Sequence, residues 1–247
     1  YKEEKKDVLN KFSLHSVFTG NPGTGKTSVA RIVAKIYRAL GILERGELIE
    51  CDREKLVGGF IGQTAMKTNE LIERARGSVL FIDEAYSLAQ GSPGDYGYEA
   101  IDTLLKRMED MRGELIVIVA GYPDRMNQFL ESNPGLKSRF DRKFEFEDYT
   151  SEELMTIIVK MLEKEDLKLD APAAECLTKY VEQLIRYKNK YFGNARAVRK
   201  VIEQIVKNQN LRLASLTMKQ RTEKMKHTVS IEDVKEFDIE KDNMLEG

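Results

Sequence analysis

The sequence predicts an α/β protein in two parts: a doubly wound, parallel five-stranded sheet, followed by a small α-helical domain. Two observations carry this prediction. In the first 149 residues, short β-branched runs alternate with helical apolar patterns, and two of the runs are apolar throughout, as strands buried on both faces are. From residue 150 onward the helical patterns continue without a long strand. We therefore expect a nucleotide-binding-type core over residues 1–149 and a helical domain over residues 150–247.

The expected strands of the core lie at residues 16–20, 48–51, 79–82 and 115–120, with a fifth, edge strand at 143–146. Helical spacing of apolar residues fills the gaps between them. One stripe ends before Gly41 and consists of Val29, Ile32, Val33, Ile36 and Leu40. Residues 64–76 form a second expected helix, with Leu71, Ile72 and Ala75 inward. A third apolar stripe consists of Ile101, Leu104, Leu105 and Met108.

Helix-start signals organise the second part. Thr150 and Glu153 have the spacing of a capping box before an apolar helical pattern, and Asp170 with Pro172 opens another helix. A third helix is expected from Ala195 to about Ala214, and Ser230 opens a last short one. Residues 228–229 could pair briefly as a strand. We expect a helical bundle.

Composition narrows the class of protein. The chain has 247 residues, with 40 Lys and Arg against 41 Asp and Glu, so no overall field recruits nucleic acid or an anionic membrane. No apolar run approaches the length of a membrane span. Cys51 and Cys176 favour a reducing, cytoplasmic compartment, and His15 and His227 are expected to be solvated or capping. The first residue is Tyr1 rather than Met, so we expect a truncated N-terminal part.

The segment from Gly20 to Thr27 matches the phosphate-loop pattern G-x-x-x-x-G-K-[ST], between an expected strand and an expected helix. Glycines let backbone N–H groups wrap the phosphates, and the helix N-terminus adds its positive dipole end. Lys26 is expected to reach the β- and γ-phosphates, and the Thr27 hydroxyl to ligate Mg²⁺. A plain glycine-rich turn is the alternative. The expected cofactors are ATP and Mg²⁺, and the expected binding residues are Asn21, Pro22, Gly23, Thr24, Gly25, Lys26, Thr27 and Ser28.

An acid pair, Asp83 and Glu84, ends the apolar run at residues 79–82. Acids often end buried strands, so the pattern alone is weak. Together with the phosphate loop it suits a neighbouring strand of the same sheet. Asp83 would then hold the Mg²⁺ shell, and Glu84 would orient or deprotonate the attacking water. Two adjacent acids with different roles favour ATP hydrolysis over nucleotide binding alone.

At this point the sequence resembles the AAA+ ATPases and, within them, the CbbX-type family, which includes red-type Rubisco activases and stage V sporulation protein K. The resemblance is carried by four segments, residues 18–27, 80–86, 120–122 and 133–140. It implies an AAA+ core with an α-helical lid domain, and a ring, expected to be a hexamer, that remodels a protein substrate.

The resemblance also implies roles for three further sites. Arg139 occupies the arginine-finger position, supplied to a neighbouring subunit, with Arg142 as the fallback and an ordinary surface arginine as the alternative. Arg196 matches the sensor-2 arginine, which would touch the nucleotide from the lid. With Lys26 and Glu84, these arginines complete the expected catalytic set. The third site is the pore-loop pattern at Phe60, Ile61 and Gly62.

Phe60 separates several interpretations. If it grips substrate, the ring threads its client; a phenylalanine that plugs a local gap in the core is the alternative. The rival function is an ATP-switched assembly or scaffold protein that holds its partner. A DNA-acting ring is disfavoured by the balanced charge. We expect protein partners, and neither nucleic acid nor membrane.

One departure from the wider superfamily stands at residues 120–122. Many AAA+ proteins carry Asn, Ser or Thr as sensor 1 at the end of the fourth strand, whereas here Gly121 has no side chain to position a water. The sensor-1 role is therefore unassigned.

Overall fold

The structure is a computed structural model that describes residues 13–60, 62–91 and 95–239. The chain divides into two compact units. The first contains the residues up to Gly20 together with Gly25–Glu147, and the second contains Asn21–Thr24 together with the chain from Asp148. Ile61, expected in the pore loop, lies outside the described residues.

The first unit is built on a five-stranded sheet in which every neighbouring pair is parallel, in the order β2-β3-β4-β1-β5. The strands are β1 (Ser16–Gly20), β2 (Leu48–Cys51), β3 (Ser78–Ile82), β4 (Leu115–Gly121) and β5 (Arg142–Phe146). The central strands β1, β3 and β4 are buried along their whole length, which confirms the expected parallel α/β sheet. One detail of the prediction is wrong: β3, which precedes the acid pair, is not the neighbour of β1, because β4 lies between them.

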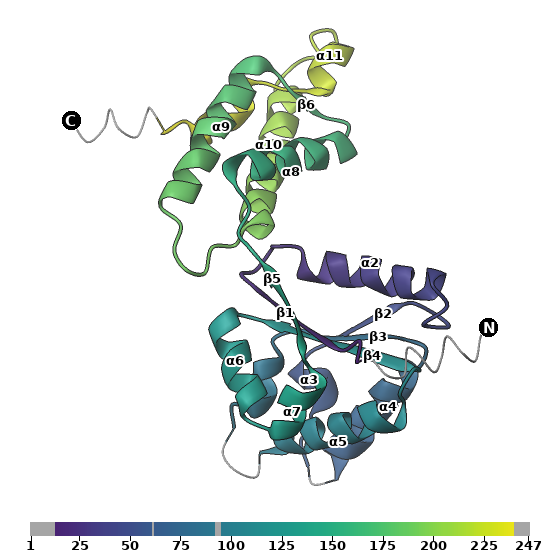
Figure 1. The fold of residues 1–247 in the computed structure, drawn as a ribbon. Coiled ribbons are helices and arrows are strands. Elements are labelled where there is room, and N and C mark those ends of the chain that lie inside the picture. Colours follow the sequence, from purple (N-terminus) through teal and green to yellow (C-terminus); the bar gives the residue numbers. More distant parts are fainter. Residues whose placement is uncertain (1–12, 61, 92–94, 240–247) are drawn as a thin grey trace. The chain divides into compact units, whose positions relative to one another are not determined.

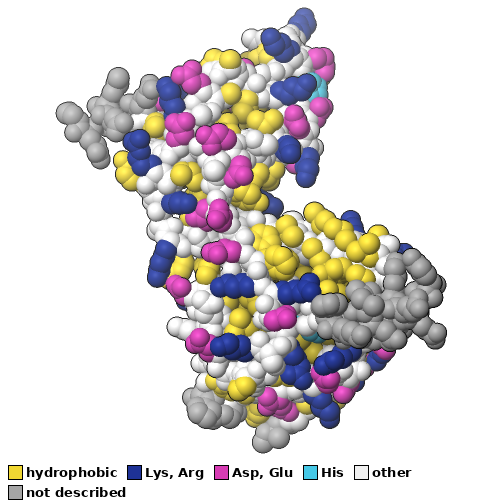
Figure 2. All heavy atoms as spheres, in the orientation of Figure 1, with side chains coloured by type: hydrophobic (Ala, Val, Ile, Leu, Met, Phe, Trp, Pro, Cys, Tyr) yellow, Lys and Arg dark blue, Asp and Glu magenta, His cyan; other side chains and the backbone are white. Residues whose placement is uncertain are grey.

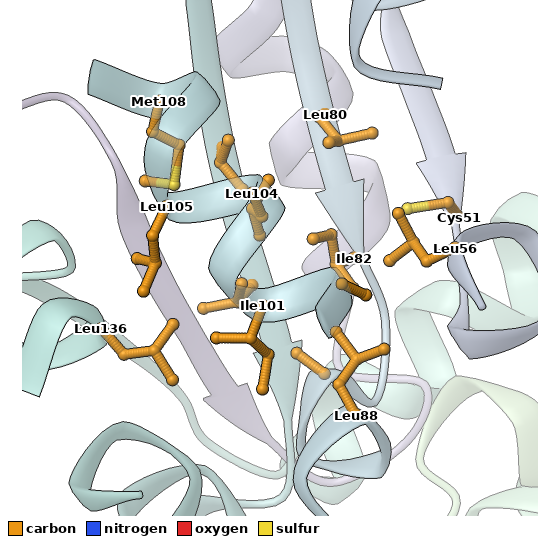
Figure 3. Packing of buried hydrophobic residues seen from close by; sticks show 14 of the residues in the cluster. Cys51, Leu56, Leu80, Ile82, Leu88, Ile101, Leu104, Leu105, Met108 and Leu136 are labelled. Carbon is orange, nitrogen blue, oxygen red and sulfur yellow. The ribbon is translucent and has the colours of Figure 1, made fainter. Parts of the chain in front are cut away.

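Helices cover both faces of this sheet (Figure 1). The helix α2 (Lys26–Ala39) lies on one face, and the helices on the other face are α3 (Arg53–Leu56), α4 (Gln63–Arg74), α5 (Tyr96–Asp110), α6 (Pro123–Glu131) and α7 (Pro134–Arg139). Figure 3 shows the packing on this second face, where Ile101, Leu104 and Met108 of α5 lie among side chains of β3 and α7. The sequence analysis had assigned no helix to α3, α6 or α7.

The apolar stripe of α2 points away from the sheet. Val29, Ile32, Ile36 and Leu40 are 37–57% exposed, whereas Ala30 and Ala34 are fully buried. An apolar stripe usually marks the face that packs on a core, and here it does not. The small alanine side chains let α2 approach the aromatic side chains of Phe18 and Phe81. A hydrophobic patch over α2 is visible in Figure 2.

The second unit is helical, as expected, around α8 (Ser151–Lys164), α9 (Ala171–Arg186) and α10 (Ala195–Ala214). Thr150 and Glu153 form the expected capping box, and Asp170 caps α9. The last helical elements of the described residues are α11 (Glu223–Lys226) and a 3-10 helix, η2 (Ile231–Phe237), and β6 (Lys168–Leu169) pairs in parallel with β7 (Thr228–Val229). Within the described residues, no helix has both the length and the apolar character needed to cross a membrane.

Candidate functional site

The phosphate loop connects β1 to α2 in the conformation that its glycines permit. Gly20 and Gly23 have φ values of 157° and 71°. A Cβ atom on Gly20 would lie 2.4 Å from the Phe146 carbonyl oxygen, so no larger residue fits there. The Lys26 ammonium donates a hydrogen bond of 2.9 Å to the Gly20 carbonyl, and the Thr24 hydroxyl donates one of 2.8 Å to the Asn21 carbonyl. The carbonyl at the start of the loop therefore holds the ammonium of the lysine at its end.

The first turn of α2 is open to an anion. It starts at Lys26, with Thr27 and Ser28 in the same turn, and among the described residues no side chain caps it. The turn also holds no acidic residue. The positive end of the helix dipole therefore faces the loop, which is the arrangement that binds phosphate.

The acid pair lies directly after β3, at the carboxyl edge of the same sheet. Asp83 is half-buried, and its backbone N–H donates to the Cys51 carbonyl at 3.0 Å. Glu84 is exposed and has φ 50° and ψ 42°, a left-handed conformation that costs a non-glycine residue roughly 1–2 kcal/mol. Its N–H donates to Asp83 Oδ1 at 3.0 Å. The two acidic residues thus differ in exposure, and Glu84 has a left-handed backbone conformation.

The candidate site offers only a few protein oxygen atoms to a metal ion, as is usual for magnesium bound together with a nucleotide. Within the part of the chain that the structure describes, no cluster of three His, Cys, Asp or Glu side chains forms a protein-only metal site. Magnesium bound with a nucleotide uses one or two protein oxygens, the phosphates and water. Thr27 and Asp83 fit that donor set, because one supplies a hydroxyl and the other a carboxylate.

Arg139 ends α7, and its side chain is 30% exposed. Its Nη2 atom lies 3.7 Å from Glu109 Oε2, a loose ion pair. Its Nε atom is buried and makes no hydrogen bond among the described residues, which is uncommon for a buried polar atom. Arg142, the fallback residue, is exposed at the start of β5.

Phe60 is 72% exposed, so the interpretation that it plugs a gap in the core is wrong. The loop that carries it is fixed at its base. The Gly58 N–H donates to the Thr64 hydroxyl at 3.0 Å, and the Thr68 hydroxyl donates to the Leu56 carbonyl at 2.8 Å. Gly62, with φ 80°, caps α4. An anchored base with an exposed aromatic tip suits contact with a partner.

In the second unit, loop residues 21–24 lie against the N-terminus of α10. The Ala195 N–H donates to the Gly23 carbonyl at 3.1 Å, and a Cβ atom on Gly23 would lie 2.8 Å from the Arg196 nitrogen. The structure therefore brings together Gly23 and Arg196, two of the residues expected to bind nucleotide. Arg196 is exposed in a helical first turn, where a cation is disfavoured by the helix dipole unless an anion joins it.

Two residues that the sequence analysis missed hold this arrangement. Asn194 is buried at a positive φ of 47°, and its amide donates to Asp148 Oδ1 at 2.7 Å and accepts from the Tyr149 N–H at 2.8 Å. Asp148 also accepts from Asn21 Nδ2 at 2.9 Å and from Lys188 Nζ at 2.8 Å. Burial raises the pKa of Asp148, but its hydrogen bonds outweigh burial and lower it. The sequence signal was an Asn directly before the expected helix, in the segment that resembles sensor 2, where the prediction gave a role to Arg196 and none to Asn194.

His15 is not a solvated residue. Its Nδ1 accepts from the Val117 N–H at 2.9 Å, and its ring lies 6.0 Å from that of Phe140. Burial lowers the pKa of His15 to about 4, and the Arg139 charge adds to the effect. His227 is exposed, and its Nδ1 lies 3.0 Å from Asp166 Oδ2.

We expect the free energy of unfolding to fall as the pH drops from about 6.5 towards 4. Because the pKa of His15 is lower in the folded chain than the ordinary 6.5, the unfolded chain takes up the proton first, which costs stability at up to ~1.4 kcal/mol per pH unit. Urea unfolding at several pH values measures this. His15→Asn, whose side-chain oxygen can accept from Val117, should flatten the slope; two identical curves would contradict the assignment.

The parallel sheet with a phosphate loop after β1 is the architecture of phosphate-loop nucleoside triphosphatases, and similarity to known families identifies this chain more closely. The model of the ATPase family associated with various cellular activities (AAA) matches residues 16–148, and the model of an AAA lid domain matches residues 150–244. This chain belongs to the AAA ATPases.

Three relatives within the AAA ATPases are 42–46% identical to this chain. Stage V sporulation protein K of Bacillus subtilis is 46% identical over 206 residues, which cover 83% of this chain and 64% of that protein. Protein CbbX of Cereibacter sphaeroides is 42% identical over 224 residues (90% of this chain, 72% of that protein). The chloroplastic ribulose bisphosphate carboxylase/oxygenase activase of Cyanidioschyzon merolae is 42% identical over 222 residues (90% and 75%). The chain thus spans about two thirds to three quarters of these relatives.

Solved structures agree on the fold. The AAA domain of FIGL-1 in complex with ADP superimposes with a TM-score of 0.65 at 19% identity, covering 94% of this chain and 74% of that one. A RuvB mutant of Thermotoga maritima gives a TM-score of 0.63 at 17% identity, covering 96% and 67%. At these identities the likeness concerns the fold alone.

Proposed function

We propose that this chain hydrolyses Mg·ATP with the residues expected from its sequence. The observation that supports the proposal is that Lys26 with Thr27 and the acid pair follow two strands of one parallel sheet at its carboxyl edge, where ligands of open α/β sheets bind. Residues 21–28 wrap the phosphates, with Lys26 as their charged group, and Thr27 and Asp83 hold the magnesium ion. Glu84 orients and deprotonates the water that attacks the γ-phosphate.

Two arginines complete the site in this proposal. Arg196 contacts the nucleotide from the lid. It lies in the first turn of α10, where the positive end of the helix dipole disfavours a cation, so an anionic partner there would be stabilising. Arg139 serves a neighbouring copy, for which its loosely paired guanidinium is suited. This requires a ring, which we propose to be a hexamer.

The ring acts on a protein substrate by threading it past Phe60. Relatives named as Rubisco activase support a protein substrate as the class. A scaffold that holds its partner is the second candidate, but the exposed Phe60 on an anchored loop favours threading. An exposed aromatic offers apolar contact to any peptide sequence, on the order of 1.5–3 kcal/mol per engaged ring.

Phe60→Ala is the test of threading. Wild-type ATP turnover should rise when casein, a largely unfolded protein, is added, and Phe60→Ala should keep its basal turnover but lose this rise. Phe60→Tyr should behave as wild type. Met66→Ala is the matched control, since Met66 is an apolar side chain that is 59% exposed on the adjoining helix. If Phe60→Ala responds to casein as wild type does, or if wild type does not respond, the holding function takes the place of threading.

A further inference from the structure

The end of β4 has no room for a side chain. Gly121 is buried, and a Cβ atom built on it would lie 2.8 Å from Tyr86 Cε1 and 3.0 Å from Met126 Sδ. The Tyr86 ring therefore occupies the space that a larger residue at this position would need. Strands β3 and β4 pair up to Ile82 and Val119, so Glu84 and Gly121 each follow two residues beyond the last pair. The ring rests at the carboxyl edge of the sheet, on the strand beside that of the acid pair.

Tyr86 is held from several sides. It is 5% exposed and lies in the short 3-10 helix η1 (Ala85–Ala89), which starts directly after Glu84. The Arg125 guanidinium carbon of α6 lies 5.1 Å from the centre of the Tyr86 ring and 5.8 Å from that of Tyr122. A guanidinium at these distances is attracted to both rings. We call Tyr86, Tyr122 and Arg125 the stacked group.

The Tyr86 phenol lies within electrostatic range of Glu84 and Arg125. Burial raises the pKa of the Tyr86 phenol, and the negative charge of Glu84 raises it further, while hydrogen bonding and charge from Arg125 act in the opposite direction. The phenol is therefore a neutral hydrogen-bond donor at neutral pH, within electrostatic range of the Glu84 carboxylate.

Glu84 needs such support because its backbone is strained. A left-handed non-glycine residue persists only where its surroundings over-determine it. The residue two positions further on, Tyr86, is held by the packing of its ring over Gly121 and by the guanidinium of Arg125.

We propose that Tyr86 and Arg125 are positioning residues for Glu84, and that they act through the stacked group. The proposal rests on the proposed role of Glu84 in hydrolysis. Tyr86 fixes the backbone and the direction of the Glu84 carboxylate, and Arg125 fixes Tyr86. Neither residue need touch the nucleotide.

The test measures kcat and KM for ATP. Tyr86→Phe keeps the ring on Gly121 and removes the hydroxyl, and Arg125→Gln removes the cation; each should lower kcat by ~10- to 100-fold, as misplacement of a catalytic group does, with KM for ATP within about twofold. Arg125→Lys, which keeps a cation over the rings, should restore most of the rate. Tyr98→Phe is the matched control, because it removes a phenol that donates to the Ala89 carbonyl at 3.1 Å.

A second arm separates positioning from general damage. If Tyr86 and Arg125 act through Glu84, adding Tyr86→Phe or Arg125→Gln to Glu84→Gln should not reduce its residual single-turnover rate further. Unchanged kcat in the single variants, or equal losses with and without Glu84, would overturn the proposal. Glu84→Gln turning over ATP at the wild-type rate would instead overturn the role of Glu84 itself, without reference to Tyr86.

Discussion

Glu84→Gln is expected to lower ATP turnover by ~10²–10⁴-fold while leaving ATP binding intact, because the amide keeps the size and position of the side chain but cannot accept a proton from water. Lys26→Ala is expected to lose turnover and binding together. In the proposed function, Lys26 supplies the charge that meets the phosphates, and its ammonium lies 2.9 Å from the Gly20 carbonyl at the start of the loop. The two variants therefore separate catalysis from binding.

Steady-state turnover and equilibrium binding of a fluorescent ATP analogue, each with Mg²⁺, check this expectation. Glu131→Gln and Lys35→Ala are matched controls, since both residues are exposed on helices of the same unit. Melting temperatures would establish that the variants are folded. Near wild-type turnover in Glu84→Gln would refute Glu84 as the base, and tight ATP binding by Lys26→Ala would refute the proposed role of the loop lysine.

Mixing Arg139→Ala with Lys26→Ala subunits is expected to restore ATP turnover that neither variant has alone. Each mixed interface can pair an intact phosphate loop from one copy with an intact arginine from the other. An arginine finger contributes about 10³–10⁵ in rate in related phosphoryl-transfer reactions, so even partial rescue should be measurable. Arg139 is only loosely paired with Glu109, which suits the proposed role of its guanidinium in a neighbouring copy.

Arg112→Ala is the matched control, because Arg112 pairs with the same Glu109 carboxylate, at 2.9 Å. It should keep wild-type turnover. Mixed assembly is verified by co-purification of differently tagged copies. If mixed assemblies form and no rescue appears, Arg139 acts within its own subunit or not at all, and the same experiment with Arg142→Ala decides whether the fallback residue serves instead.

Much of the fold was predictable because its signals are local. The apolar runs in β3 and β4 identified strands buried on both faces, and the capping box at Thr150 marked the start of α8 within one turn of helix. The short helices α3, α6 and α7 gave no such signal, because four to nine residues hold too few turns for an apolar period to stand out.

The orientation of α2 could not be predicted from the local sequence pattern. Periodicity identified an apolar face, but which face packs on the sheet depends on the side chains of the opposing strands. Phe18 and Phe81 leave room for Ala30 and Ala34, so the larger aliphatic residues of the helix are exposed. The order of the strands in the sheet, with β4 between β1 and β3, also could not be predicted. Long connections join these strands, and the sequence does not state which strands become neighbours.

For the candidate site, the sequence by itself determined the parts whose chemistry lies in consecutive residues: the phosphate loop around Lys26, and Asp83 with Glu84. Only the tertiary structure decided how those parts are supported. In the sequence, Gly121 shows only that no side chain is present at the end of β4. The structure shows that the ring of Tyr86, 35 positions earlier, occupies the space that such a side chain would need. Asn194 and Asp148 likewise meet loop residues more than 120 positions away. Contacts at such separations depend on chain reversal and packing, which no local pattern encodes.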